Sequence, residues 1–285
     1  MADLGRNNPI LTGFHPDPSI CRVGDEYFLA TSTFEWFPGV RLHRSHDLSN
    51  WQPAGYALTR ADQLDMRGNP DSGGVWAPCL THDGTQFWLV YTNMRRHQGS
   101  VKDGLNYVVS APSIEGPWSA GTFLNSSGFD PSLFHDEGGQ SWLAQMLWDH
   151  EPAPSHFAGI ALQKFDRASR KLTGKRHMIT AGTKIGLTEG PHIYKRDGYY
   201  HMLLAEGGTG YDHACSWARA REITGPYEMH PDNPILTSRD APDLALQKAG
   251  HGDWVETPEG KSYLVHLVGR PLPGKRCILG RETAI

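Results

Sequence analysis

Short apolar runs alternate with acidic-Gly turns along the whole chain. Residues 27–32 follow the turn at 24–26, and residues 87–91 follow the turn at 83–86. Apolar and polar positions alternate within such runs, and no long stretch shows the 3.6-residue period of an amphipathic helix. The pattern predicts short strands joined by hairpins, and therefore an all-β protein.

One unit of this pattern recurs five times. It consists of a polar start, a Pro or small residue, an apolar strand, an acidic-Gly turn and an aromatic strand. Its copies begin at Asp17, Trp76, Asp130, Glu189 and His251. A unit of roughly 55–60 residues holds four short strands with their loops, which is one propeller blade. WD40 repeats are shorter, at about 40–45 residues, so the spacing predicts a five-bladed β-propeller of another kind.

The inner strand of a propeller blade begins near the axis, so we expect the first residue of each repeat to face a central funnel. Three of these five residues are acids, namely Asp17, Asp130 and Glu189. Taken singly, each acid also fits a turn whose carboxylate accepts backbone N–H bonds. Three acids converging from separate blades instead indicate a functional site, because crowded carboxyls repel and at least one stays protonated. Separated pKa values are what acid–base chemistry requires.

Composition narrows the alternatives. Gly and Pro make up 52 of 285 residues, which implies many turns, and 29 residues are aromatic, with nine Trp among them. Aromatic rings on such a scaffold suit stacking against sugars and suit an ordinary β core equally well. The net charge is −4 and basic residues are scattered, so neither nucleic acid nor an anionic membrane is an expected partner.

No apolar run approaches the roughly 20 residues of a membrane span. The first eight residues lack the apolar stretch of a secretory signal, so we expect a cytoplasmic protein. The cysteines are far apart and lack CxxC spacing, so we expect free buried thiols rather than disulfides or a zinc site. They are Cys21, Cys79, Cys215 and Cys277.

Several segments closely resemble the β-xylosidase branch of glycoside hydrolase family 43. The similarity runs in register from about Asn8 to Ile285 and is carried by residues 14–20, 31–40, 73–78, 127–136, 187–192 and 279–285. The resemblance implies a five-bladed propeller that releases xylose from the non-reducing end of β-1,4-xylo-oligosaccharides with inversion. It also implies side activity on α-L-arabinofuranosides.

The resemblance assigns roles by matching position. Asp17 would be the general base, Glu189 the general acid, and Asp130 the residue that tunes and orients Glu189. Substrate-binding positions would be Phe34 and Trp76 around the terminal sugar, Arg281 beside the carboxylates, His251 at the bottom of the funnel, and Trp148 and Thr209 further along the pocket. Some relatives hold a calcium ion near the axial histidine, so His251 is a candidate Ca²⁺ ligand, although the chemistry needs only carboxylates and no cofactor.

Relatives of this branch continue into a C-terminal β-sandwich domain, whereas this sequence ends at Ile285. We therefore expect a single propeller domain over residues 1–285 and leave open its oligomeric state and whether blade five is complete. Two other functions fit the sequence. One is an α-L-arabinofuranosidase that uses the same residues, and the other is a carbohydrate-binding propeller without turnover.

Overall fold

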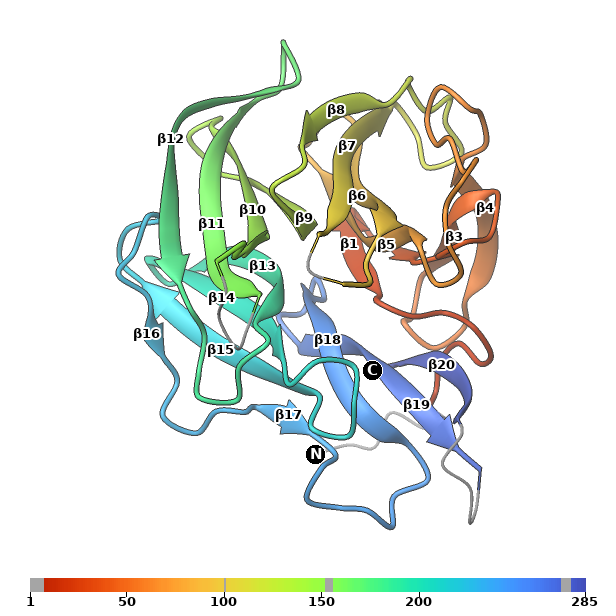
Figure 1. The fold of residues 1–285 in the computed structure, drawn as a ribbon, viewed down its shortest axis with the longest axis vertical. Helices are drawn as coiled ribbons and strands as arrows, with labels where there is room; N and C mark the ends of the chain where they lie inside the picture. The colour runs from red at the N-terminus through yellow and green to blue at the C-terminus, as the bar shows by residue number, and fades with distance from the viewer. Residues whose placement is uncertain (1–7, 100, 152–155, 273–277) are drawn as a thin grey trace.

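Five antiparallel sheets surround one axis in the computed structural model, which describes residues 8–99, 101–151, 156–272 and 278–285 (Figure 1). Every regular element in these ranges is a β-strand. Consecutive strands pair with each other, apart from a short fifth strand in blade four that pairs with the third strand of that blade, so each blade is a meander. The structure confirms the predicted all-β, five-bladed propeller.

The blades follow one another along the chain. Blade one contains β1 (Ser19–Val23), β2 (Glu26–Thr31), β3 (Gly39–Ser45) and β4 (Gln52–Leu58). Blade two contains β5 (Gly74–His82), β6 (Phe87–Arg96), β7 (Asp103–Ala111) and β8 (Thr122–Asn125). Blade three contains β9 (Gly128–His135), β10 (Ser141–Trp148), β11 (Phe157–Asp166) and β12 (Lys171–Thr180).

Blade four contains β13 (Glu189–Arg196), β14 (Tyr199–Glu206), β15 (Ala214–Ala220), β16 (Glu228–Met229) and β17 (Leu236–Thr237). Blade five contains β18 (Gln247–Glu256), β19 (Ser262–Pro271) and β20 (Ile278–Ala284). The inner strands β1, β5, β9, β13 and β18 contact one another in a closed ring around the axis. That ring positions the five repeat starts.

Apolar side chains pack mainly between neighbouring blades. One cluster joins Phe28 and Leu42 of blade one to Leu89 of blade two, and another joins Ile20 to Val265 across blades one and five. Burial of this apolar surface, at about 25 cal/mol per Å², holds each blade against the next. The core is therefore a ring of interfaces around the axis.

The segment before β1 closes the ring by adding to blade five. Leu11 and Thr283 exchange backbone hydrogen bonds of 3.2 and 3.1 Å, and the His15 N–H donates to the Arg281 carbonyl at 2.7 Å. The hydroxyl of the fully buried Thr283 donates to the His15 carbonyl at 2.7 Å. The three strands of blade five thus gain a fourth partner from the other end of the chain.

A left-handed residue near the start of each inner strand marks the same point in every repeat. Its position differs from the predicted repeat start in two blades. Residues at five positions have left-handed backbone angles, with φ of 53, 23, 51, 54 and 45° at Asp17, Ala77, Asp130, Gly190 and His251. In β5, β9, β13 and β18 the pairing register also shifts at this point. The predicted repeats begin at Trp76 and Glu189, whereas the left-handed residues are Ala77 and Gly190, one position later.

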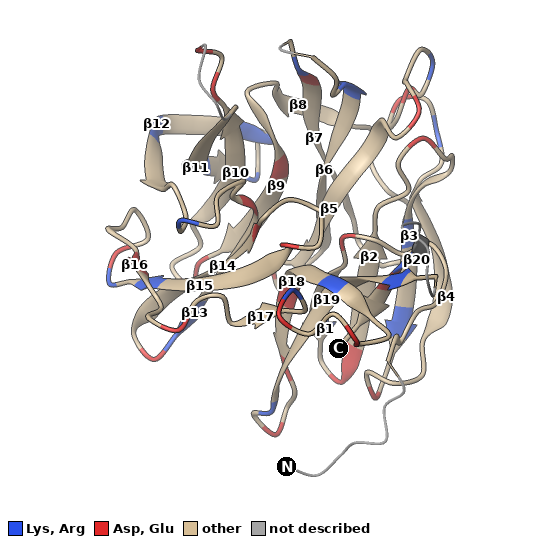
Figure 2. Ribbon diagram, turned by 60° about the horizontal axis from the view of Figure 1, so that its bottom comes forward, with Lys and Arg blue, Asp and Glu red and all other residues tan. Residues whose placement is uncertain are grey.

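Charged residues of both signs are spread over the strands and loops. In Figure 2 Lys and Arg are interspersed with Asp and Glu, and neither sign covers a whole face in this view. Within the described residues, no helix is both long and apolar enough to cross a bilayer. Cys21, Cys79 and Cys215 are free, as predicted, although Cys21 is only half-buried, and Cys277 lies outside the described residues.

The ring closure yields a stability prediction. Thr283→Val keeps the side-chain shape but leaves the buried His15 carbonyl without its hydroxyl donor. We expect the free energy of unfolding to fall by about 1–3 kcal/mol, measured by urea denaturation. Thr173→Val, at an exposed position of β12, is the control and should change it by less than about 0.5 kcal/mol. Equal values for the two variants would contradict a closing role for this bond.

Candidate active site

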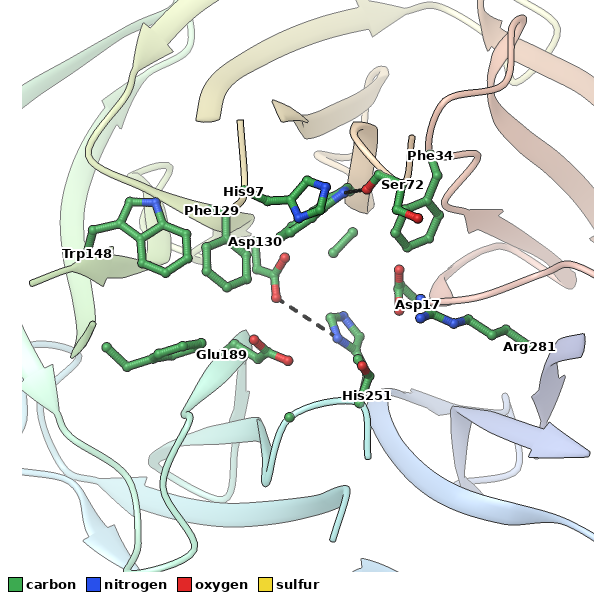
Figure 3. A pocket seen from close by; sticks show the side chains of 15 residues that line it. Asp17, Phe34, Ser72, His97, Phe129, Asp130, Trp148, Glu189, His251 and Arg281 are labelled. Atoms are coloured by element: carbon green, nitrogen blue, oxygen red, sulfur yellow. Dashed lines mark hydrogen bonds and ion pairs between the residues drawn. The ribbon is translucent and has the colours of Figure 1, made fainter. Parts of the chain in front are cut away.

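A cavity of about 370 Å³ opens on the propeller axis, and all five blades contribute to it (Figure 3). All nine predicted site residues line this cavity. They are Asp17, Phe34, Trp76, Asp130, Trp148, Glu189, Thr209, His251 and Arg281. The first residues of the five repeats therefore converge, as predicted. In blades two and four the left-handed residue lies one position after the predicted start.

The left-handed residues explain how neighbouring side chains reach the same cavity. Side chains in a regular strand alternate between its two faces, but here Trp76 and Ala77 both line the pocket, as do Phe129 and Asp130. A bulge-like irregularity breaks the alternation and re-aims a side chain. Left-handed backbone costs a non-glycine residue on the order of 1–3 kcal/mol, and packing of the inner ring holds it in place.

Asp17 lies just before β1 and is 6% exposed. One of its carboxylate oxygens accepts a hydrogen bond of 2.7 Å from the Ser32 hydroxyl. Ser32 follows β2, and its N–H donates to the Pro16 carbonyl at 3.0 Å. Two bonds from one serine therefore fix both the backbone and the side chain at this position.

Asp130 comes from the head of β9 and is equally buried. Its Oδ2 accepts a 3.1 Å hydrogen bond from the Gly190 N–H and lies 4.0 Å from Nδ1 of His251. The Gly190 bond links blade three to the residue that follows Glu189. Gly190 is required here, because a Cβ atom at its position would approach the His251 ring to 2.9 Å.

Burial and like charge raise the pKa values of two of the acids. Burial, followed by the charge of Asp17, raises the pKa of Glu189 to about 8. Burial and the charges of Glu189 and Asp17 raise the pKa of Asp130 well above its usual range, partly opposed by the Gly190 N–H bond. The two groups interact and titrate as a pair. Glu189 is thus a protonated acid near neutral pH.

Figure 3 shows Asp17 and Glu189 approaching the cavity from different sides, with His251 and Asp130 between them. Burial lowers the pKa of His251, although Asp17 opposes the shift, so the imidazole is neutral at neutral pH. A protonated carboxyl facing a second carboxyl across a cavity is the arrangement that acid–base cleavage requires.

Aromatic rings form one continuous wall. The ring centroids of Trp76 lie 6.3 Å from Phe34 and 5.6 Å from Phe129. Phe129 in turn lies 4.7 Å from Trp148. The Arg281 guanidinium stacks over Phe34 at 5.3 Å, which extends the wall with a cation. Such a wall matches the apolar faces of a sugar ring, while the acids lie beside it.

Sequence reasoning missed six further lining residues, namely Ser72, Ala77, His97, Phe129, Phe157 and Gly208. Phe129 and Ala77 adjoin residues that were singled out, so a bulge at the repeat start would have predicted both. Ser72 accepts a 2.9 Å hydrogen bond from Trp76 Nε1 through its carbonyl. His97 packs 5.5 Å from Trp76. Its position beyond β6 carries no signal in the sequence.

An axial cavity with three buried carboxyls, among them a protonated Glu189, and an aromatic wall defines the class of site that glycoside hydrolysis uses. Comparison with known proteins gives the family. The model of glycosyl hydrolases family 43 matches residues 6–285. The chain belongs to this family.

Individual relatives agree with this assignment. The chain is 62% identical to xylosidase/arabinosidase 43B of Humicola insolens over 98% of its own length and 52% of the relative's. It is 52% identical to a β-xylosidase of Bacillus subtilis, with 98% and 54% covered. The crystal structure of xylan β-1,4-xylosidase from Bacillus halodurans superimposes with a TM-score of 0.96 at 59% identity, covering 98% of this chain and 53% of that one. The chain thus spans about half the length of these relatives.

The raised pKa of Glu189 predicts a change in stability with pH. Its pKa is about 4.5 in the unfolded chain and about 8 in the folded protein, so the folded state binds this proton more tightly. The contribution to stability is therefore full below about pH 4.5 and is lost as the pH rises towards 8. Glu189→Gln, a neutral mimic of the protonated acid, should lose less stability between pH 5 and 8 than the parent does.

Urea denaturation across this range measures the difference, which we expect to be on the order of 1–4 kcal/mol. Glu222→Gln, at an exposed position, is the matched control and should follow the parent. Parallel curves for the parent and Glu189→Gln would contradict the raised pKa.

Proposed function

We propose that this propeller releases xylose from the non-reducing end of β-1,4-xylo-oligosaccharides with inversion of configuration. The observation that carries the proposal is the pairing of a protonated Glu189 with Asp17 across one axial cavity. The names of the relatives, which include β-xylosidases, support this substrate class.

In the proposed reaction, Glu189 donates its proton to the glycosidic oxygen as the bond to the anomeric carbon breaks. Asp17 takes a proton from a water molecule, whose oxygen attacks the anomeric carbon from the opposite face. The Ser32 hydroxyl orients the Asp17 carboxylate by donating to its other oxygen. We expect the two carboxyls to be about 6.5–9.5 Å apart, as inverting enzymes require room for water.

Asp130 and His251 support this pair without exchanging protons with the sugar. Asp130 adds negative charge next to Glu189 whenever it ionises, which makes the proton of Glu189 harder to remove. It also holds the backbone next to Glu189 through the Gly190 N–H. Phe34 and Trp76 stack on the terminal sugar, and Arg281, Trp148 and Thr209 complete the binding surface.

The residues present do not fit a calcium ion. Potential ligand atoms of Asp130, Glu189 and His251 lie within 4.8 Å of one another. Calcium prefers six to eight oxygen ligands, whereas this group offers one nitrogen and two carboxyls. The proposed reaction therefore uses carboxyl groups alone.

The stereochemistry tests the proposal. Proton NMR of xylobiose hydrolysis should show α-xylose as the first new anomer from the β-linked bond. Glu189→Ala should lower kcat on xylobiose about 10²- to 10⁴-fold, because the leaving oxygen loses its proton donor. Glu222→Ala is the control and should match the parent.

Two outcomes would contradict this mechanism. A first-formed β-anomer would exclude inversion. Binding of xylobiose without hydrolysis would support the carbohydrate-binding alternative, which the three buried acids make less favourable because neutral sugars bind to amides and aromatic rings without them.

An α-L-arabinofuranosidase is the second candidate, because the Humicola insolens relative is named for both activities. We expect kcat/KM to be higher on 4-nitrophenyl β-D-xylopyranoside than on the α-L-arabinofuranoside, since the flat faces of Trp76 and Phe34 suit a six-membered chair. Steady-state rates on the two substrates measure the ratio. A ratio below one would favour the arabinofuranosidase.

A further inference from the structure

A fully buried carboxylate lies behind the strand that carries Glu189. Glu206, the last residue of β14, is 0% exposed. Its Oε1 accepts hydrogen bonds from the Thr183 N–H at 2.6 Å and the Thr188 hydroxyl at 3.0 Å. Its Oε2 accepts from the Thr183 hydroxyl at 2.7 Å and the Ser216 hydroxyl at 2.5 Å. All four donors are neutral groups.

Three of these four bonds hold the segment that leads into β13. Residues 181–188 contain no regular structure and end at Thr188, immediately before Glu189. A further bond, from the Gly207 N–H to the Gly186 carbonyl at 2.9 Å, joins the same segment to the residue after Glu206. The packing is tight here, because a Cβ atom on Gly182 would come within 2.0 Å of the Thr188 hydroxyl oxygen.

The head of β13 needs such support. Glu189 pairs with Ala205 of β14, but the register shifts before the next pair at His192. The ladder is therefore interrupted beside the proton donor. A general acid works only within hydrogen-bond reach of its target, and a displacement of about 1 Å can lower the rate about 10²-fold.

Glu206 would influence where the Glu189 side chain lies, rather than the pKa of Glu189. The causes that raise the pKa of Glu189 are its burial and the charge of Asp17. The carboxylate of Glu206 is instead occupied by its four donors. Its bonds to Thr183 and Thr188 fix where the backbone enters β13, and so where the Glu189 side chain begins.

We propose that Glu206 is a positioning residue that aims Glu189 at the glycosidic oxygen by anchoring residues 181–188. This inference rests on the function proposed above. Glu206 contacts neither the sugar nor the reacting atoms, and its effect reaches them through Thr188 and the backbone of Glu189.

The dependence on the leaving group tests this role. Xylobiose needs a proton on its leaving oxygen, whereas 2,4-dinitrophenolate leaves unprotonated. Glu206→Ala should therefore lower kcat about 10²-fold on xylobiose and less than about fivefold on 2,4-dinitrophenyl β-xyloside. A merely structural role would reduce the active fraction and lower both rates equally.

Two milder variants keep the test valid if Glu206→Ala does not fold. Thr188→Val and Ser216→Ala each remove one hydroxyl from the same carboxylate, from beside Glu189 and from β15 respectively. We expect Thr188→Val to lower kcat on xylobiose about tenfold with little change on the dinitrophenyl substrate. Ser216→Ala should leave both rates within about twofold.

Glu206→Gln should restore most of the rate on xylobiose. Its amide oxygen can accept the bonds made to Oε1, and its NH₂ can donate to the hydroxyls of Thr183 and Ser216, which also accept. Equal losses on both substrates, or equal effects of Thr188→Val and Ser216→Ala, would overturn the positioning role alone. A parent that hydrolyses neither substrate would overturn the proposed function and this inference with it.

Discussion

Convergence of five inner strands on one axis is the constraint on which the rest of this structure depends. Each strand meets the axis at a left-handed residue, from Asp17 in blade one to His251 in blade five. These conformations are costly outside glycine and persist because the neighbouring inner strands pack around them. Their effect is to break side-chain alternation at the axis, so that Phe129 and Asp130 face the same cavity. The cavity and the positions of its acids therefore follow from the way in which the five inner strands pack.

The buried carboxyl groups of this protein differ in the number of hydrogen bonds that they accept. Glu206 accepts four hydrogen bonds, and Asp253 of β18 accepts bonds from Ser19, Ile20 and Tyr194. From the residues that the structure describes, Asp17 and Asp130 each accept a single one. Hydrogen-bond donors favour the charged form of an acid, whereas burial and like charge oppose it. The well-bonded carboxylates support the backbone, whereas the sparsely bonded Asp130 has a pKa well above its usual range because it is buried among like charges.

The predicted site residues could be placed around one cavity because the repeat start is visible in the sequence. Asp-Pro at residues 17–18 and 130–131 marks the axial turn directly. Blade four was misread by one position, because Glu189 is the conspicuous residue while the turn itself falls on Gly190. Phe129 was missed because, in a strand with regular alternation, its side chain would point away from that of Asp130. His97 lies beyond β6 and reaches the pocket only through the packing of blade two, which no local pattern records.

By itself, the sequence determined the five repeats, the all-β class and the acids that meet on the axis, because hydrophobic alternation and turn residues are local properties of the chain. Only the tertiary structure decided how those acids behave. The pKa of Glu189 depends on burial and on Asp17, which is 172 positions away in the chain. The closure of blade five likewise depends on Leu11 meeting Thr283. Desolvation, charge proximity and ring closure all arise from distances across the fold, and those distances exist only once the blades have packed together.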